Sequence, residues 1–454
     1  MKNCYLKRFQ MLLAALMVGL VLVSCSESDE SGAVDHDPAK PITLAKFWPD
    51  KGPIATQVII EGTNFGTNVD DITVLFNEKP ATIISSTGDR MLVLAPKLPG
   101  EECVITVKVG KKSAKFDKIF DYIVQTSVST IAGGIQAATQ PTGTTSLASW
   151  QSAKKLERSL AIDSQDNLFI TVNGVPGGSW DNECRIYMLN EEAGVIKALH
   201  DVSRWFGFNN IAYDYKTDEI YWFGSQMGDD GYGCLSRMSD YAGVSMGNVA
   251  WEEMPPYTTE GMTSWGARSH FEMNPSDGKF YFFTNEGSCG RFDPATGKGE
   301  NLSSDVTKEM EGDCAGVVFD PRDNNIVYVA AKNRHCIFKF DMAANTVEVW
   351  AGKKNSAGFL DGALDEALFN EPCQMACDGE YIYVADANNH CIRKINLATG
   401  YVSTLAGVAQ SAGYVNGDAL NAQFNRPMGL VLDSEGNLYV GDCENYAIRR
   451  VATE

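Results

Sequence analysis

Short apolar runs alternate with turn residues along much of this chain, most clearly between Glu371 and Gly407. Four runs of four or five residues lie in that stretch, and the gaps between them hold Gly379, Asn388-Asn389 and Thr399-Gly400. Gly and Asn tolerate positive φ angles and form local hydrogen bonds, so they suit tight turns. The pattern therefore predicts four strands in an antiparallel meander, whose apolar face needs a neighbour to cover it.

The same pattern recurs along the chain, and an Asp or Asn closes the first strand of each copy. Six positions share this role: Asp163, Asp214, Asn274, Asp320, Asp378 and Asp433. They are spaced by 46 to 60 residues. A repeat of this length with four strands per unit is typical of a β-propeller. We therefore predict a six-bladed propeller.

The two ends of the repeat region predict how the ring closes. The sixth copy offers only three strands before Glu454. Far upstream, VSTIAGG at Val128–Gly134 nearly duplicates VSTLAG at Val402–Gly407, which is the fourth strand of the fifth copy. We expect the upstream strand to complete the last blade, because a closed ring leaves no sheet edge free for aggregation.

Two of the copies resemble a known repeat family. The segments FNEPCQMACDGEYIYVADANNHCIRKI (Phe369–Ile395) and FNRPMGLVLDSEGNLYVGDCENYAIRRV (Phe424–Val451) are similar to NHL repeats. The resemblance implies an NHL-type β-propeller over residues 126–454, clearest in the last three blades.

Residues 41–125 form a separate all-β segment. Its predicted strands are bounded by Gly, Pro and Asn and lie at Val58–Gly66, Ile72–Ile84, Met91–Pro96 and Cys103–Val109. The segment resembles an IPT/TIG domain, which implies an immunoglobulin-like sandwich. It carries no cluster of titratable residues, and we interpret it as a spacer.

The N-terminus resembles the leader of a bacterial lipoprotein. Residues 1–24 combine a positive start with the 13 apolar residues Met11–Val23, too few to cross a membrane comfortably. The sequence before Cys25 resembles a lipobox, which implies cleavage there and acylation of Cys25; ordinary secretion is the alternative. The acidic run Ser26–Glu30 resembles a surface-export signal of Bacteroidota lipoproteins, although a solvated linker would look the same. Residues 25–40 are predicted to be a flexible tether.

Charge and cysteine spacing exclude several classes of function. The net charge of −20 would become −23 after removal of residues 1–24, so nucleic-acid binding is not expected. Sulfated glycans are disfavoured unless Lys154, Lys155 and Arg158 form a basic patch.

Cys373 and Cys377 are four residues apart on one strand, about 13 Å, whereas a disulfide needs Cα atoms within about 7 Å. Without a Cys-x-x-Cys pair a zinc site is not predicted either, and we expect no cofactor.

Aromatic residues fall in loops that an up-and-down propeller places on one face. Blade connections hold Trp150, Trp205, Trp265, Phe359 and Tyr414, and second-to-third-strand loops hold Trp180 and Tyr232. Polar neighbours include Asp181, Arg158, Arg268 and Arg426. Flat rings beside carboxylates and guanidinium groups suit a sugar, which stacks its C–H face and hydrogen-bonds its hydroxyls. The alternative is that several of the tryptophans fill gaps between blades.

These features predict an outer-membrane lipoprotein that binds a glycan or oligosaccharide and faces the cell exterior. The build resembles accessory lipoproteins of glycan-uptake systems in Bacteroidota, which implies an outer-membrane transporter complex as partner. An enzyme is not expected, because no three His, Asp or Glu residues stand at matching repeat positions. A metal-assisted lyase or hydrolase in the central funnel and a protein-interaction scaffold remain the alternatives.

Overall fold

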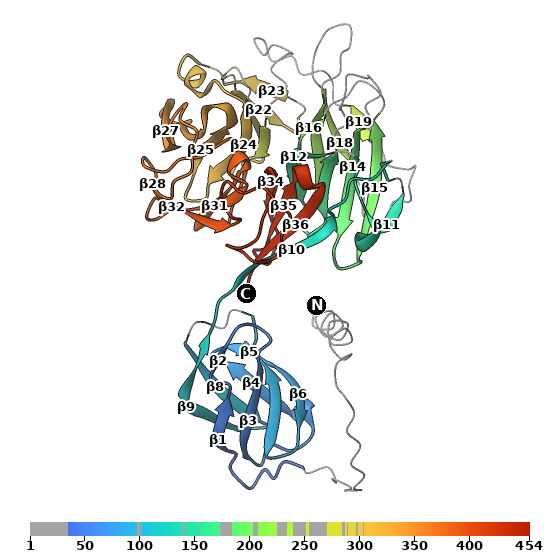
Figure 1. Cartoon of the computed structure of the whole chain (residues 1–454), viewed down its shortest axis with the longest axis vertical. Coiled ribbons are helices and arrows are strands. Elements are labelled where there is room, and N and C mark those ends of the chain that lie inside the picture. The colour runs from blue at the N-terminus through green and yellow to red at the C-terminus, as the bar shows by residue number, and fades with distance from the viewer. Residues whose placement is uncertain are drawn as a thin grey trace. The chain divides into compact units, whose positions relative to one another are not determined.

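The chain divides into two compact units, Met1–Ile123 and Val124–Glu454, each of which is described by itself. The computed structural model (Figure 1) describes residues 35–97, 100, 102–138, 140–141, 143–153, 155–172, 184–202, 208–224, 234–238, 251–253, 270–283, 287, 289–296, 298–302 and 304–454. The predicted leader, with Cys25, lies outside these ranges. Within them no helix is long and apolar enough to span a membrane.

The first unit packs two sheets face to face. One has the order β1 (Thr43–Trp48), β3 (Gln57–Thr63), β7 (Arg90–Leu94), β6 (Thr82–Ser86). The other has the order β2 (Lys51–Gly52), β9 (Lys112–Tyr122), β8 (Glu102–Val109), β4 (Ile72–Phe76), β5 (Lys79–Pro80). Alternate residues of β8 point inward, as the period of two requires. Phe120 contacts Phe76 edge-on at 5.1 Å in the core, so the predicted immunoglobulin-like sandwich is confirmed.

The described residues of the second unit form six antiparallel sheets, which we number blades 1 to 6 (Figure 1). Blade 1 has the strand order β11 (Thr144–Ser146), β15 (Val195–Val202), β14 (Cys184–Asn190), β13 (Leu168–Val172), β12 (Leu156–Ile162). Blade 2 has the order β16 (Phe208–Asp214), β17 (Glu219–Gly224), β18 (Cys234–Met238), β19 (Trp251–Glu253). Blade 3 has the order β20 (His270–Met273), β21 (Phe280–Phe283), β22 (Cys289–Asp293), β23 (Lys298–Asn301).

Blades 4 to 6 complete the ring. Blade 4 has the strand order β24 (Cys314–Asp320), β25 (Asp323–Ala331), β26 (Cys336–Asp341), β27 (Thr346–Gly352). Blade 5 has the order β28 (Gly362–Ala363), β32 (Tyr401–Ala406), β31 (Cys391–Asn396), β30 (Tyr381–Asp386), β29 (Pro372–Cys377). Blade 6 has the order β33 (Gly417–Asp418), β10 (Thr126–Gly133), β36 (Ala447–Thr453), β35 (Leu438–Asp442), β34 (Pro427–Leu432). The first strands β12, β16, β20, β24, β29 and β34 contact one another in a closed cycle.

The upstream strand closes the ring as predicted. β10 pairs antiparallel with β36, from Thr126 opposite Thr453 to Gly133 opposite Ala447. Figure 1 shows the teal β10 beside the red β36. Blade 6 therefore takes its fourth strand from the start of the unit, and the all-β fold class with a strand-closed propeller is confirmed.

Polar side chains tie the first strands together at the centre of the ring. The Gln374 side chain on β29 accepts the backbone N–H groups of Leu160 (2.8 Å) and Leu430 (2.9 Å) through Oε1, and its Nε2 donates to the Leu160 carbonyl (2.8 Å). Gln374 thereby joins blades 5, 6 and 1. The Ser159 hydroxyl on β12 likewise donates to the Ile211 carbonyl of blade 2 (3.0 Å). These bonds satisfy backbone groups on strand edges that have no neighbouring strand.

Candidate functional site

Two kinds of loop emerge on one face of the propeller. Short 3₁₀ turns join second to third strands: η6 (Lys332–Arg334), η7 (Ala387–Asn389) and η8 (Cys443–Asn445). The first residue of each turn donates its N–H to the residue that immediately precedes the first strand of the same blade, at 2.8, 3.2 and 3.3 Å. Blade connections and second-to-third-strand turns therefore meet where the first strands begin, and we call this side of the ring the loop face.

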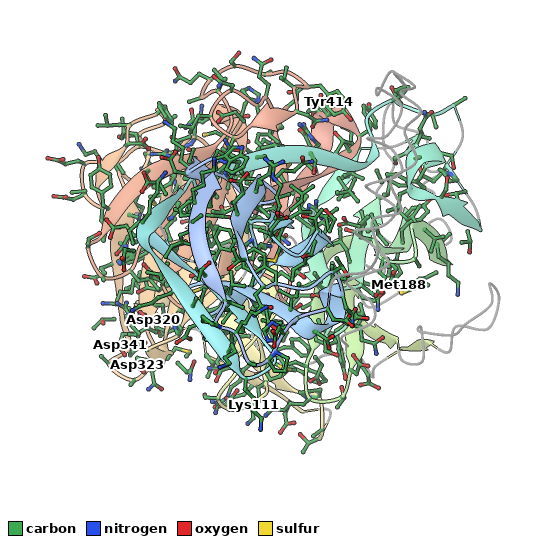
Figure 2. All side chains as sticks on the ribbon, turned by 90° about the horizontal axis from the view of Figure 1, so that it is seen from below. Lys111, Met188, Asp320, Asp323, Asp341 and Tyr414 are labelled. Atoms are coloured by element: carbon green, nitrogen blue, oxygen red, sulfur yellow. The ribbon has the colours of Figure 1, made fainter. Side chains whose placement is uncertain are left out.

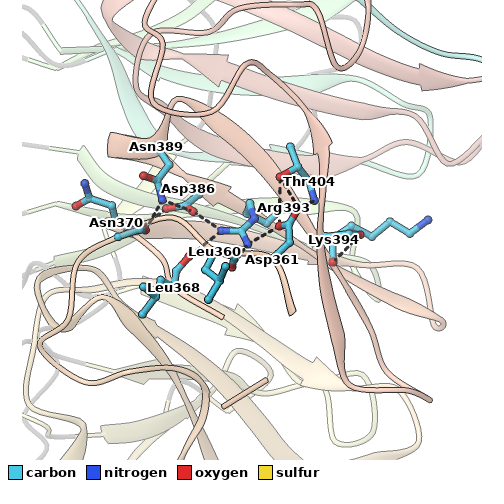
Figure 3. Close-up of polar contacts among 11 residues, drawn as sticks. Leu360, Asp361, Leu368, Asn370, Asp386, Asn389, Arg393, Lys394 and Thr404 are labelled. Atoms are coloured by element: carbon cyan, nitrogen blue, oxygen red, sulfur yellow. Dashed lines mark hydrogen bonds and ion pairs between the residues drawn. The ribbon is translucent and has the colours of Figure 1, made fainter. Parts of the chain in front are cut away.

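Buried arginines hold the blade connections against blades 5 and 6. Arg393 on β31 is fully buried, and its Nη1 bonds Asp386 Oδ2 (2.9 Å) and the Leu368 carbonyl (2.9 Å). Its Nη2 bonds the Leu360 carbonyl (2.7 Å) and Asp361 Oδ1 (2.6 Å), as Figure 3 shows. One guanidinium thus holds the connection that leads into blade 5, using the planar fork of donors that only Arg offers.

Blade 6 repeats this clamp with different partners. Arg449 bonds Asp442 Oδ2 (2.7 Å) and Asn416 Oδ1 (2.7 Å). Its guanidinium lies between the rings of Tyr414 (4.8 Å) and Phe424 (5.1 Å). The predicted site residue Tyr414, which is labelled in Figure 2, is half-exposed, with 43% of its surface accessible. Its ring packs on the buried Arg449 guanidinium. Its hydroxyl donates to Thr130 Oγ1 (2.9 Å) on β10, which fixes the ring.

Phe359 occupies the same place on blade 5. Its ring lies 4.8 Å from the Arg393 guanidinium, which Phe369 covers from a distance of 5.0 Å. Phe359 and Tyr414 therefore both lie in loop-face connections, and both pack on a guanidinium. Both rings help to hold their connections, and Tyr414 also offers exposed aromatic surface.

Trp150 does not line the loop face, contrary to our expectation. It is 1% exposed, lies in the core between blades 6 and 1, and packs edge-on against Tyr187 at 5.5 Å. Tyr187 lies opposite Ile170 in blade 1, just as Arg393 lies opposite Val384 in blade 5. Blade 1 therefore has Tyr187 in place of the clamping arginine, and the Trp150 ring packs on that tyrosine. Trp150 thus fills a gap between blades.

Most of the other predicted site residues lie outside the described residues. This holds for Trp180, Asp181, Trp205, Tyr232, Trp265 and Arg268. Arg158 lies in β12, and its side chain is not described. The convergence of these residues on the loop face stays a prediction.

A charged residue immediately precedes four of the six first strands. Of these four residues, the sequence analysis named only Arg426 as a polar neighbour of the predicted site. Lys155, Asp313, Glu371 and Arg426 stand immediately before β12, β24, β29 and β34. Because the first strands form a closed cycle, these positions surround the axis of the ring at the loop face. The signal in the sequence was a charge directly before four of the six first strands.

These charges pair across the blades. Arg426 Nη2 lies 2.8 Å from Glu371 Oε2, and Lys332 Nζ lies 3.6 Å from the same oxygen and 3.4 Å from Asp313 Oδ2. We call Asp313, Lys332, Glu371 and Arg426 the charged collar. A separate pair joins Lys155 Nζ to Glu444 Oε2 at 2.6 Å.

Burial sets the protonation of the histidines behind the collar. Burial lowers the pKa of His335 and of His390, so both stay neutral near pH 7. Each accepts a backbone N–H through Nδ1, from Glu371 (3.2 Å) and Arg426 (3.1 Å) respectively. A neutral ring nitrogen is the acceptor that these contacts require. Both histidines therefore position the collar.

Burial has the opposite effect on the clamp carboxylates. It raises the pKa of Asp386 and of Asp442 to about 6, although the neighbouring arginines and asparagines oppose the rise. Both stay ionised near pH 7. In the part of the chain that the structure describes, no three His, Cys, Asp or Glu side chains are grouped so as to hold a metal.

Two protein-family models match the chain, one in each unit. Residues 43–122 match the model of the IPT/TIG domain, and residues 424–450 match that of the NHL repeat. The chain carries an IPT/TIG domain and an NHL repeat. The NHL match coincides with blade 6, which holds the second arginine clamp. The predicted combination of IPT/TIG domain and NHL-type propeller is confirmed.

Curated relatives share only a short part of the chain. Protein SUPPRESSOR OF QUENCHING 1 from Arabidopsis thaliana is 39% identical over 96 residues, which are 21% of this chain and 9% of that protein. The human NHL repeat-containing protein 2 is 33% identical over 107 residues, 15% of its length. The likeness is confined to a stretch the length of about two blades.

Solved structures of similar fold match nearly the whole chain. An auxiliary nutrient binding protein from Bacteroides ovatus has a TM-score of 0.66 at 21% identity, covering 93% of this chain and all of that one. Another of that description, from Bacteroides thetaiotaomicron, has a TM-score of 0.58 at 20% identity over 92% of this chain and 99% of its own. A candidate phosphatase from the same bacterium scores 0.56 at 19% identity, covering 92% and 98%. At these identities the likeness shows the fold alone.

Proposed function

We propose that this protein is a surface lipoprotein that binds a glycan or oligosaccharide on the loop face of its propeller, as an accessory to outer-membrane glycan uptake. One observation carries the proposal: both auxiliary nutrient binding proteins match this chain over at least 92% of its length. The shared fold includes the IPT/TIG domain and the propeller together. Capture of a nutrient by such a molecule needs a fixed binding surface and no catalytic group.

The loop face offers features that suit a sugar. Tyr414 presents an exposed ring whose position is fixed by Arg449 and Thr130. A ring held in this way loses little conformational freedom when a ligand stacks on it. The charged collar adds fixed donors and acceptors on the same face.

Affinity electrophoresis of the full chain in gels containing single polysaccharides tests the proposal. We expect at least one polysaccharide to slow the protein, and Trp180→Ala, Trp265→Ala and Tyr414→Ala to weaken the retardation. Because a central aromatic ring stacks on the sugar face, its removal should lower the affinity for the polysaccharide about tenfold. Ile84→Ala, at an exposed position on the IPT/TIG domain, is the matched control. The absence of retardation by every polysaccharide, or release of reducing ends from one, would contradict the proposal.

A further inference from the structure

Two of the four collar residues lie where the backbone conformation favours glycine over a long side chain. Glu371 and Arg426 have φ angles of +60° and +56°, and each precedes a proline, Pro372 or Pro427. Glycine adopts this left-handed conformation without the strain that other residues incur. At both positions the chain nevertheless carries a long charged side chain, which indicates a role for the side chain itself.

The collar holds its polar groups in place before any ligand arrives. The four side chains are between 15% and 31% exposed, so each is largely buried and still accessible to solvent. Glu371 Oε2 accepts a hydrogen bond from Arg426 and forms an ion pair with Lys332, which links blades 4, 5 and 6. Two cations and two anions balance each other, and the collar is locally neutral on a chain of net charge −20.

We propose that the charged collar is a binding subsite for an uncharged, hydroxyl-rich ligand, the chemical class of a neutral sugar ring. This inference rests on the proposed function and assigns it a place and a ligand class. A hydroxyl group both donates and accepts, so it can bridge Glu371 and Arg426 without separating them. Charge-assisted hydrogen bonds of this kind are about twice as strong as neutral ones.

Charged ligands fit the collar poorly. An anionic ligand would have to displace Glu371 from Arg426 and Asp313 from Lys332, and it would approach a strongly acidic molecule. A cationic ligand would have to displace Lys332 or Arg426 in the same way. Separating partly buried partners leaves the released charge unsatisfied, which disfavours both. A neutral polyol meets neither obstacle.

Affinity measurements with the full chain test the inference. The probes are neutral polysaccharides (dextran, a β-1,3-glucan and a mannan) and the anionic polygalacturonate and chondroitin sulfate. We expect binding to a neutral probe, lowered about 10- to 100-fold in Glu371→Gln and in Arg426→Gln. Arg426→Lys, which keeps the cation but loses the planar fork, should retain more affinity than Arg426→Gln.

The matched control is Glu348→Gln. Glu348 pairs with Lys339 at 3.1 Å across β26 and β27, in blade 4 but on the strands farthest from the axis. It should bind as the unaltered chain does. Thermal unfolding of every variant separates a loss of the site from a loss of the fold. If the arginine variants unfold, Glu371→Gln still tests the site, because it keeps the shape of the side chain.

Three results would overturn the inference. Equal affinity for a neutral probe in both collar variants and in Glu348→Gln would remove the collar from the site and leave the proposed function standing. Preference for polygalacturonate or chondroitin sulfate would exclude the neutral ligand class. Binding to none of the probes would reject the proposed function, and the collar inference with it.

Discussion

Single residues decide how each blade meets its neighbour, and Glu272 departs from the repeat. It stands two positions before Asn274, where the other five copies carry Ala161, Ala212, Val318, Ala376 and Val431. Burial raises the pKa of this carboxyl to about 7. The folded protein therefore keeps a proton on Glu272 at pH values where the unfolded chain has already lost it.

This difference predicts a stability that falls with pH. Between about pH 4.5 and 7 the folded state binds more protons at Glu272 than the unfolded state, so the contribution of this residue is full below that window and is lost as pH rises through it. Urea unfolding at pH 5 and pH 7.5 should show that Glu272→Ala removes about 2 kcal/mol of this dependence. An unchanged difference between the two pH values would contradict the expectation.

The arginine clamp gives a second prediction at this scale. Arg393→Phe would leave Asp386 buried without its cation and should cost about 3 to 5 kcal/mol in the free energy of unfolding. Blade 4 shows the compensated form, because Ala331 and Phe338 stand at the equivalent positions. Asp386→Ala combined with Arg393→Phe should therefore recover at least half of the loss in denaturant unfolding. A double variant no more stable than Arg393→Phe would show that the bonds to the connection dominate.

At the scale of elements, β10 carries the closure of the ring. It lies between β36 and β33 and shields the edge of β36 that its absence would expose. An unpaired edge in a sheet of this length is a template for pairing with another chain. The sequence predicted this strand from its likeness to β32, because both serve as fourth strands.

A proline in β10 should open the last blade. Val128 is 2% exposed and pairs with Val451, and Val128→Pro removes a backbone donor inside a three-strand arrangement. We expect a lower unfolding temperature and aggregation at micromolar concentration, measured by light scattering. Val128→Ala, which keeps the backbone bonds, should cost only about 1 to 3 kcal/mol and stay soluble. Equal behaviour of the two variants would argue against closure as the cause.

At the scale of the whole molecule, two units with separate cores share one chain. The sandwich core lies entirely within the first unit, and the propeller cores lie within the second. The predicted lipid on Cys25 would attach this molecule to the outer membrane through the tether at residues 25–40. The attachment to the outer membrane and a partner transporter there stay part of our proposal.

Cell fractionation tests the anchor. The unaltered chain should sediment with outer membranes, because more than one acyl chain on a cysteine holds a protein stably in a bilayer. Cys25→Ala should release the protein into soluble fractions, while Cys103→Ala, at a buried position in the sandwich, should not. A Cys25→Ala variant that stays in the membrane would rule out the lipid as the anchor.

The sequence by itself determined the fold class, the closing strand and the two family resemblances. These follow from local periodicity, turn residues and near-identical segments such as Val128–Gly134 and Val402–Gly407, all of which survive in one dimension. It also placed Tyr414 and Phe359 in loop-face connections. Trp150 was misplaced, because the same aromatic residue suits an exposed loop or a gap between blades.

Only the tertiary structure decided which residues meet. Asp313, Lys332, Glu371 and Arg426 are spread over more than one hundred positions, and nothing local marks them as partners. The closed cycle of first strands brings them around one axis. Likewise, Arg393 meets the Leu360 carbonyl only because the blade connection folds back over blade 5 in the tertiary structure. Such contacts depend on ring closure, which fixes distances between residues that the chain itself keeps far apart.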